Sequence, residues 1–172
     1  MLISRTTLLS SLLLLRTTCA PGPNPSTDNI LTSERIEQPA RPGLGVVVLR
    51  DVRAAGQQGF DRVVFEFEGK DVPGYRVGYV DQAIQCGSGE PVEIAGEALL
   101  EVRMTPAQAH TEAGEPTVKN RERSLDLPVL KELESTCDFE ADVTWILGLG
   151  SRKAFRVQTL ENPARLVIDL EH

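Results

Sequence analysis

The sequence predicts an all-β fold with minor α content, a β-sandwich of two small sheets with about eight strands and one or two short helices. Apolar and polar side chains alternate along several short segments, which is the period of a half-buried strand. The 14 glycines and 11 prolines mark turns between these segments at the short spacing of a sandwich. A chain of 172 residues is long enough for one domain with its own core and an N-terminal extension.

Residues 1–18 have the pattern of an export signal, because a positive charge precedes an apolar run at residues 8–15 that is too short to span a membrane. Cys19 follows in the place of the lipidated first residue of a bacterial lipoprotein, although Arg16 and Thr18 depart from the usual lipoprotein signal. Lipidation of Cys19 is the first interpretation. The alternatives are ordinary secretion with cleavage near this cysteine, and an undistinguished N-terminal segment of a cytosolic protein.

Residues 19–43 are polar and proline-rich, which predicts a flexible tether, and the domain is expected to occupy residues 44–172. The strands are predicted at residues 45–55, 59–69, 74–80, 92–96, 97–104, 138–149, 154–160 and 164–170. The side chains predicted to share buried faces are Val63, Phe65 and Phe67; Tyr75, Val77 and Tyr79; Ala98, Leu100, Val102 and Met104; and Val143, Trp145 and Leu147.

One short helix is predicted at residues 105–110, where Thr105 suits the N-cap, Pro106 the first helical position and Gln108 a capping box. Residues 125–135 fit either a second short helix or a strand. Between these two segments we expect a polar loop.

A six-residue unit occurs twice, as RVVFEF (Arg62–Phe67) and RLVIDL (Arg165–Leu170). Shorter aromatic-Arg-Val segments also occur twice, as YRV at 75–77 and FRV at 155–157. The repeat indicates either two related halves that pair around a local two-fold axis or coincidence, since apolar alternation makes such matches common.

The formal net charge of −7 argues against nucleic acid as a partner and against attachment to anionic lipid by a basic patch. If Cys19 is acylated, Cys86 and Cys137 remain as a pair that fits a disulfide of an oxidising compartment, or else as two unrelated buried thiols. No CxxC is present and neither histidine has a useful spacing to a cysteine, so we expect no metal and no cofactor.

The sequence shows no convincing catalytic site, because it lacks GxSxG, HExxH and phosphate-loop motifs, and GLGSRK at 148–153 is interpreted as a hairpin turn. The one mid-chain histidine, His110, is expected to be exposed to solvent.

Four charged residues are candidates for a binding surface. Arg62 and Glu66 share one strand face, and Arg165 and Asp169 share another. They fit either cross-strand salt bridges or a polar patch that meets sugar hydroxyls or peptide charges. Of the aromatic candidates for a sugar platform, which are Phe60, Tyr75, Tyr79 and Trp145, Tyr75 and Trp145 are expected in the core. A polar groove or an exposed strand edge would then be the binding element.

Five motifs in order, GFDRVVFEFEG, PGYRVGYV, GSGEPVEIAGEALLEVRM, DFEADVTWILGLGS and FRVQTLENPARLVIDLEH, resemble the AMIN-like domain family of exported bacterial proteins and lipoproteins. That family is similar to the AMIN domain found beside N-acetylmuramoyl-L-alanine amidases. The resemblance implies a β-sandwich that acts as a peptidoglycan-binding targeting module. Cysteines at positions 86 and 137 are unusual for the family, which suggests an added disulfide.

Together these observations predict an exported, non-enzymatic module of the cell envelope, lipid-anchored through Cys19 or else periplasmic or secreted, that contacts peptidoglycan or another wall polymer. A protein-interaction scaffold that uses the same sandwich is the alternative. A hydrolase is the third hypothesis, and no visible nucleophile, metal set or acid–base pair favours it.

Overall fold

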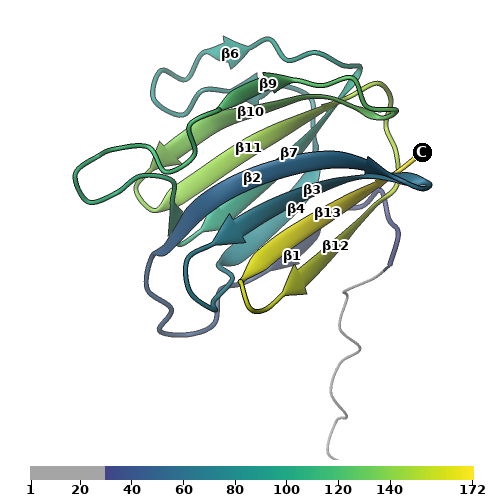
Figure 1. The fold of residues 1–172 in the computed structure, drawn as a ribbon. Coiled ribbons are helices and arrows are strands. Elements are labelled where there is room, and N and C mark those ends of the chain that lie inside the picture. The colour runs from purple at the N-terminus through teal and green to yellow at the C-terminus, as the bar shows by residue number, and fades with distance from the viewer. Residues whose placement is uncertain (1–29) are drawn as a thin grey trace, which may run out of the picture.

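The computed structural model describes residues 30–172, which fold as an all-β structure of two sheets packed face to face (Figure 1). One sheet has six strands in the order β1-β4-β7-β11-β10-β9, the other has five in the order β12-β13-β3-β2-β8, and β5 and β6 form a separate hairpin. Neighbouring strands are antiparallel except β2 and β8. The strands are β1 (Ile36–Gln38), β2 (Val47–Gln57), β3 (Phe60–Phe67), β4 (Gly74–Val80), β5 (Ala83–Ile84), β6 (Pro91–Val92), β7 (Ala98–Thr105), β8 (Ala107–Gln108), β9 (Glu122–Ser124), β10 (Leu130–Phe139), β11 (Asp142–Leu149), β12 (Phe155–Leu160) and β13 (Arg165–Glu171).

The proposed export signal, residues 1–18, and the lipidation candidate Cys19 lie outside the described residues. Within residues 30–172, no helix has the length and apolar character that a membrane crossing requires.

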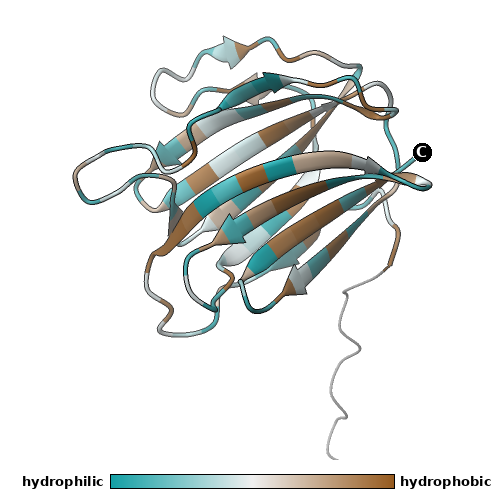
Figure 2. Cartoon of the chain, viewed as in Figure 1, coloured by the Kyte–Doolittle hydropathy of each residue, from teal (hydrophilic) through white to brown (hydrophobic). Residues whose placement is uncertain are grey.

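The core lies between the two sheets and is built from the alternating side chains that the sequence predicts. Phe65 and Trp145 are fully buried and meet edge to face, with ring centroids 6.2 Å apart. Figure 2 shows apolar and polar residues interleaved along β2, as expected for a strand with one buried face. Tyr75 is buried as predicted, whereas Tyr79 is half-buried and its hydroxyl donates to the carbonyl of Lys153 at 2.6 Å.

The predicted helix at residues 105–110 is wrong. Thr105 ends β7, the Thr105–Pro106 peptide is cis, and Ala107–Gln108 form β8, which pairs in parallel with β2. Ala107 and Ala109 are both buried, so this segment has the period of a strand. Pairing with β2 therefore outweighs the local capping signal.

Three further segments are clarified by the sheet pairing. Residues 125–135, which fit a helix or a strand, contain the start of β10, which pairs with β9 and β11. The predicted polar loop at 111–124 ends in β9. The predicted hairpin turn at 148–153 is wrong, because it connects β11 of one sheet to β12 of the other.

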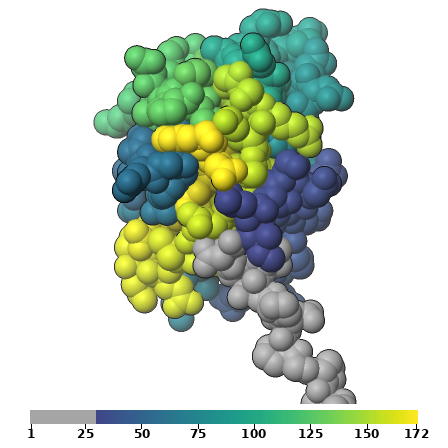
Figure 3. Space-filling model, turned by 90° about the vertical axis from the view of Figure 1, so that its right-hand side faces the viewer, coloured from purple at the N-terminus to yellow at the C-terminus, as the bar shows by residue number. Residues whose placement is uncertain are grey.

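Part of the expected tether is ordered. Ile36–Gln38 form β1 and pair with β4 of the six-stranded sheet, and Thr32 pairs with Phe155 of the five-stranded sheet through two 2.8 Å backbone hydrogen bonds. This segment therefore crosses from one sheet to the other, and Figure 3 shows it (purple) packed on the body of the domain. The structured region begins before Leu44.

The two copies of the repeated unit are neighbouring strands, β3 and β13. In their antiparallel register Arg62 lies opposite Asp169, Arg165 lies opposite Glu66, and the central valines face each other. The two units are thus related by a local two-fold axis. The shorter repeat does not extend this symmetry, because YRV lies in β4 and FRV lies in β12 of the opposite sheet.

Candidate functional site

The four charged residues predicted from the repeat lie on the outer face of the five-stranded sheet. Asp169 is only 1% exposed, and it accepts hydrogen bonds from Arg62 Nε at 2.6 Å and from Arg156 Nη2 at 2.6 Å. Both guanidinium groups also lie near the Phe60 ring, at 5.0 and 5.7 Å from its centroid. Burial raises the pKa of Asp169, but the hydrogen bonds from Arg62 and Arg156 outweigh it and hold the pKa below its usual value.

The other two charged residues of this group do not join that cluster. Glu66 accepts from Arg53 Nη2 at 2.8 Å, and Arg165 Nε donates to the carbonyl of Pro163 at 3.2 Å. The structure therefore brings Arg62 and Asp169 together as a cross-strand salt bridge and leaves Glu66 and Arg165 in separate contacts. This arrangement favours a stabilising role over a binding role for the Arg62–Asp169 pair.

The outer face of the six-stranded sheet carries a different arrangement. The strand register places Glu37, Arg76, Arg103, Thr144 and Cys137 directly opposite one another on five successive strands. We call these residues the transverse row. Neighbouring strands are about 4.8 Å apart, so the row extends for about 19 Å across the sheet.

Two arginines occupy the middle of the transverse row, and each is paired with an acid. Arg76 Nη2 donates to Glu101 Oε1 at 2.8 Å, and Arg103 Nε donates to Asp142 Oδ2 at 2.6 Å. The hydrogen bond to Asp142 raises the pKa of Arg103. Thr144 is close to the same carboxylate, with its hydroxyl 3.3 Å from Asp142 Oδ1. The face therefore presents hydrogen-bond donors and acceptors side by side.

A groove follows the transverse row. One section has a volume of about 570 Å³ and is lined by Glu101, Thr144 and the disulfide, and the adjoining section has about 410 Å³ and is lined by Glu37 and Arg76. Arg103 and Thr105 line both sections, so the two sections adjoin at β7.

Two apolar side chains stand at the wider section of the groove. Phe139 is 64% exposed and lies opposite Asp142 in register, and Ile84 is 43% exposed. The larger section of the groove therefore combines exposed apolar area with a polar floor.

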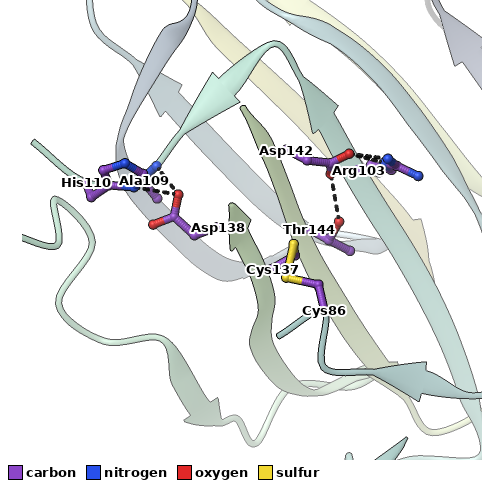
Figure 4. The surroundings of a disulfide bond; sticks show 8 residues. All are labelled: Cys86, Arg103, Ala109, His110, Cys137, Asp138, Asp142 and Thr144. Carbon is purple, nitrogen blue, oxygen red and sulfur yellow. Dashed lines mark hydrogen bonds and ion pairs between the residues drawn. A yellow bond between two sulfur atoms is a disulfide. The ribbon is translucent and has the colours of Figure 1, made fainter. Parts of the chain in front are cut away.

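The excursion at residues 81–97, which contains the β5–β6 hairpin, forms one wall of the groove. The Cys86–Cys137 disulfide joins it to β10, which confirms the predicted bridge, and Cys86 N donates to the carbonyl of Thr136 at 3.0 Å. At its other end, Ala95 N donates to Glu132 Oε2 at 2.6 Å. Figure 4 shows the disulfide beside Thr144, with the Arg103–Asp142 pair next to it.

His110 belongs to a second polar cluster, seen beside the disulfide in Figure 4. Its Nδ1 lies 2.9 Å from Asp138 Oδ1, and Arg121 Nη2 donates to Asp138 Oδ2 at 2.7 Å. His110 is thus half-buried at the end of a strand segment, where we expected exposure at the end of a helix. Within the described part of the chain, no group of three or more His, Cys, Asp or Glu side chains is placed to hold a metal ion.

The sequence did not point to Arg76, Arg103 or Asp142. They lie on three strands, and only the register of β4, β7 and β11 brings them into one surface. The available signal was the outward-facing charge in each strand, which is common on any solvated sheet face.

The family model of the AMIN-like domain matches residues 47–172. The chain belongs to the AMIN-like domain family. No curated protein and no solved structure gives a significant match. AMIN-like domains are associated with exported envelope proteins and are generally non-catalytic binding or targeting modules. The all-β sandwich observed here agrees with that membership.

Proposed function

We propose that this AMIN-like protein is a non-catalytic binding module that holds peptidoglycan or another wall polymer in the groove along the transverse row. The observation that carries the proposal is the pair of adjoining groove sections over Arg76 and Arg103. Their lining residues come from all five strands of the transverse row, which extends for about 19 Å. A groove of this length with paired polar groups suits an extended polymer. The AMIN-like family adds the expectation that the polymer belongs to the cell envelope.

Co-sedimentation of the full-length protein with purified peptidoglycan sacculi tests this proposal. We expect saturable binding that survives moderate salt, and a loss of about tenfold in affinity for Arg103→Gln. Arg50→Gln is the matched control, because Arg50 forms an exposed ion pair with Glu68 outside the groove. Absence of binding to every wall preparation would remove the proposal.

The same experiment distinguishes the two outer faces. Arg165→Gln and Glu66→Gln alter the surface predicted from the repeat. Both residues make exposed contacts, so we expect the fold to tolerate these changes. If these variants abolish binding and Arg103→Gln does not, the binding surface is the five-stranded sheet.

A protein-interaction scaffold is the second candidate, and the edge of β12 is the observation that favours it. β12 is the last strand of the five-stranded sheet, and among residues 30–172 its outer side carries one recorded bridge, from Thr32 to Phe155. An edge strand of this kind accepts an added strand from a partner. Crosslinking that recovers a stoichiometric envelope protein without wall binding would select this function.

Attachment to the membrane through Cys19 and export by residues 1–18 complete the proposal. Incorporation of labelled fatty acid into the wild-type chain, and its loss in Cys19→Ser, is the expected result. A secreted, unlabelled wild-type protein would select ordinary secretion.

A further inference from the structure

We propose that the groove recognises the neutral glycan strand of the wall polymer, with its ion-paired side chains bonding sugar hydroxyls and Phe139 packing on a sugar ring. This inference rests on the proposed function and names the part of the polymer that the site contacts. The competing ligand is the carboxylate-bearing peptide stem.

Both guanidinium groups of the groove are already paired with acids of the protein. Arg76 is paired with Glu101 and Arg103 with Asp142, and Glu37 lies beside Arg76 in the transverse row. Glu140 also lines the groove, so two cations stand against four anions and the lining has a net charge of −2. An anionic ligand would have to compete with Glu101 and Asp142 for the guanidinium groups and would meet repulsion from Glu37. A neutral ligand pays neither cost.

Each ion pair offers what a sugar hydroxyl group requires. A guanidinium N–H donates, the adjacent carboxylate oxygen accepts, and a hydroxyl group does both. Arg76–Glu101 and Arg103–Asp142 repeat this donor–acceptor combination on adjacent strands. Thr144 adds a further hydroxyl beside Asp142. Hydrogen bonds that involve an ionised partner are the stronger ones, so these pairs can exchange water for sugar hydroxyls without loss.

The apolar face of a pyranose ring needs a flat apolar partner, and Phe139 supplies one. Its side chain is 64% exposed at the rim of the groove, and Phe139 lies directly opposite Asp142, the acid paired with Arg103. Ile84 lines the same section and comes from the excursion at residues 81–97. A charged peptide stem would gain little from either side chain.

The length of the transverse row favours an extended glycan chain over a single sugar as the ligand. Two sections that share Arg103 and Thr105 cross five strands, or about 19 Å, which is longer than one ring. The glycan is therefore expected to run across the strands of the six-stranded sheet, from β1 toward the disulfide.

Binding of the full-length protein to three purified probes tests the inference: intact sacculi, soluble stem peptides, and peptide-free glycan strands, which are released by an amidase and then amidated at the freed lactyl carboxylates so that they are neutral. We expect sacculi and peptide-free strands to bind with similar affinity and the stem peptides not to compete. If sacculi bind and peptide-free strands do not, the inference is overturned and the proposed function stands. If neither binds, the proposed function itself fails.

Charge removal separates the two ligands further. For a glycan, Asp142→Asn and Arg103→Gln both remove hydrogen-bonding partners, so both weaken binding by about tenfold. For a stem carboxylate, Asp142→Asn frees a guanidinium and removes a repelling charge, so binding would tighten. Tighter binding by this variant overturns the inference.

Phe139→Ala keeps the test independent of folding, because the side chain is mostly exposed. It is expected to weaken binding to peptide-free strands by about tenfold with an unchanged melting temperature. Arg50→Gln is the control that retains full binding. Full binding by Phe139→Ala would contradict the proposed stacking contact.

Discussion

Arg62 and Asp169 lie opposite each other on β3 and β13 and are joined by a 2.6 Å hydrogen bond. Of the two Arg–acid pairs that the repeat places in register, this is the one that bonds among residues 30–172. The related pair, Arg165 and Glu66, is opposed in the same register but bonds elsewhere. The side chains therefore do not keep the local two-fold symmetry of the backbone: Asp169 bonds Arg62 and Arg156, whereas Glu66 bonds Arg53 of β2.

Asp169→Asn is expected to lower the free energy of unfolding by about 2–3 kcal/mol, since it removes charge-assisted bonds to a buried acceptor. Arg165→Gln changes an exposed contact and is expected to stay within about 0.5 kcal/mol of wild type. Urea unfolding at pH 7 measures both. Equal losses of unfolding free energy for the two variants would show that the bonds to Asp169 stabilise the fold no more than an exposed contact does.

Acid is expected to destabilise the protein through Asp169 and Asp138. Burial raises the pKa of Asp138, but bonds from the Ala109 N–H, Arg121 and His110 outweigh it, so the pKa of each carboxyl is lower in the folded state. Their stabilisation is full above the unfolded pKa of about 4 and is lost as pH falls through the folded values. Urea midpoints between pH 7 and pH 2 check this. A variant with both aspartates replaced by asparagine should lose much of the decline, and an unchanged slope would contradict it.

Ionisation of Glu134 should lower the stability of the fold, whereas ionisation of Asp169 and Asp138 raises it. Burial raises its pKa, and the charges of Glu122 and Glu132 raise it further, so the ionised form is disfavoured in the folded protein. Glu134→Gln is expected to raise stability slightly at pH 7, and the gain should vanish as pH falls below the unfolded pKa of about 4.3. Urea midpoints at pH 7 and pH 4 measure the difference, with the exposed Glu112→Gln as a control. A gain that persists at low pH would assign the effect to packing.

Much of the sandwich followed from the sequence because its strands are half-buried and show a period of two. Val63, Phe65 and Phe67 alternate with polar residues and are all buried. The helix at 105–110 could not be excluded in the same way, since its capping residues are sound locally and only the parallel partner β2 decides against it.

The groove could not be predicted from the sequence, for a different reason. The groove is lined by single residues of five strands and so depends on sheet order, and β4, β7 and β11 are adjacent only through non-sequential pairing. The disulfide could be predicted from the sequence because Cys86 and Cys137 were the two cysteines left after Cys19 was assigned to lipidation.

The Cys86–Cys137 disulfide is expected to stabilise both the fold and the groove wall. It closes a loop with a sequence separation of 51, and the chain-entropy model gives about 4 kcal/mol for such a loop. The double variant Cys86→Ser with Cys137→Ser should lose roughly that amount in urea unfolding. Amide hydrogen exchange should rise in residues 81–97 before it rises in the core strands. Uniform exchange across the domain would show that the excursion is held by its other contacts.

Gly148 is expected to be essential for the closure of that excursion over β11. A side chain at this position would collide with the carbonyl of Ala95 and with Ile94, and Ala95 is fixed there by its bond to Glu132. Gly148→Ala should therefore cost about 1–3 kcal/mol and weaken the Ala95–Glu132 contact. Gly87→Ala is the matched control, because nothing lies within 4 Å of its added methyl group. The melting temperatures of the two variants measure the difference. If Gly148→Ala and the control melt at the same temperature, the excursion moves freely enough to accommodate the methyl group.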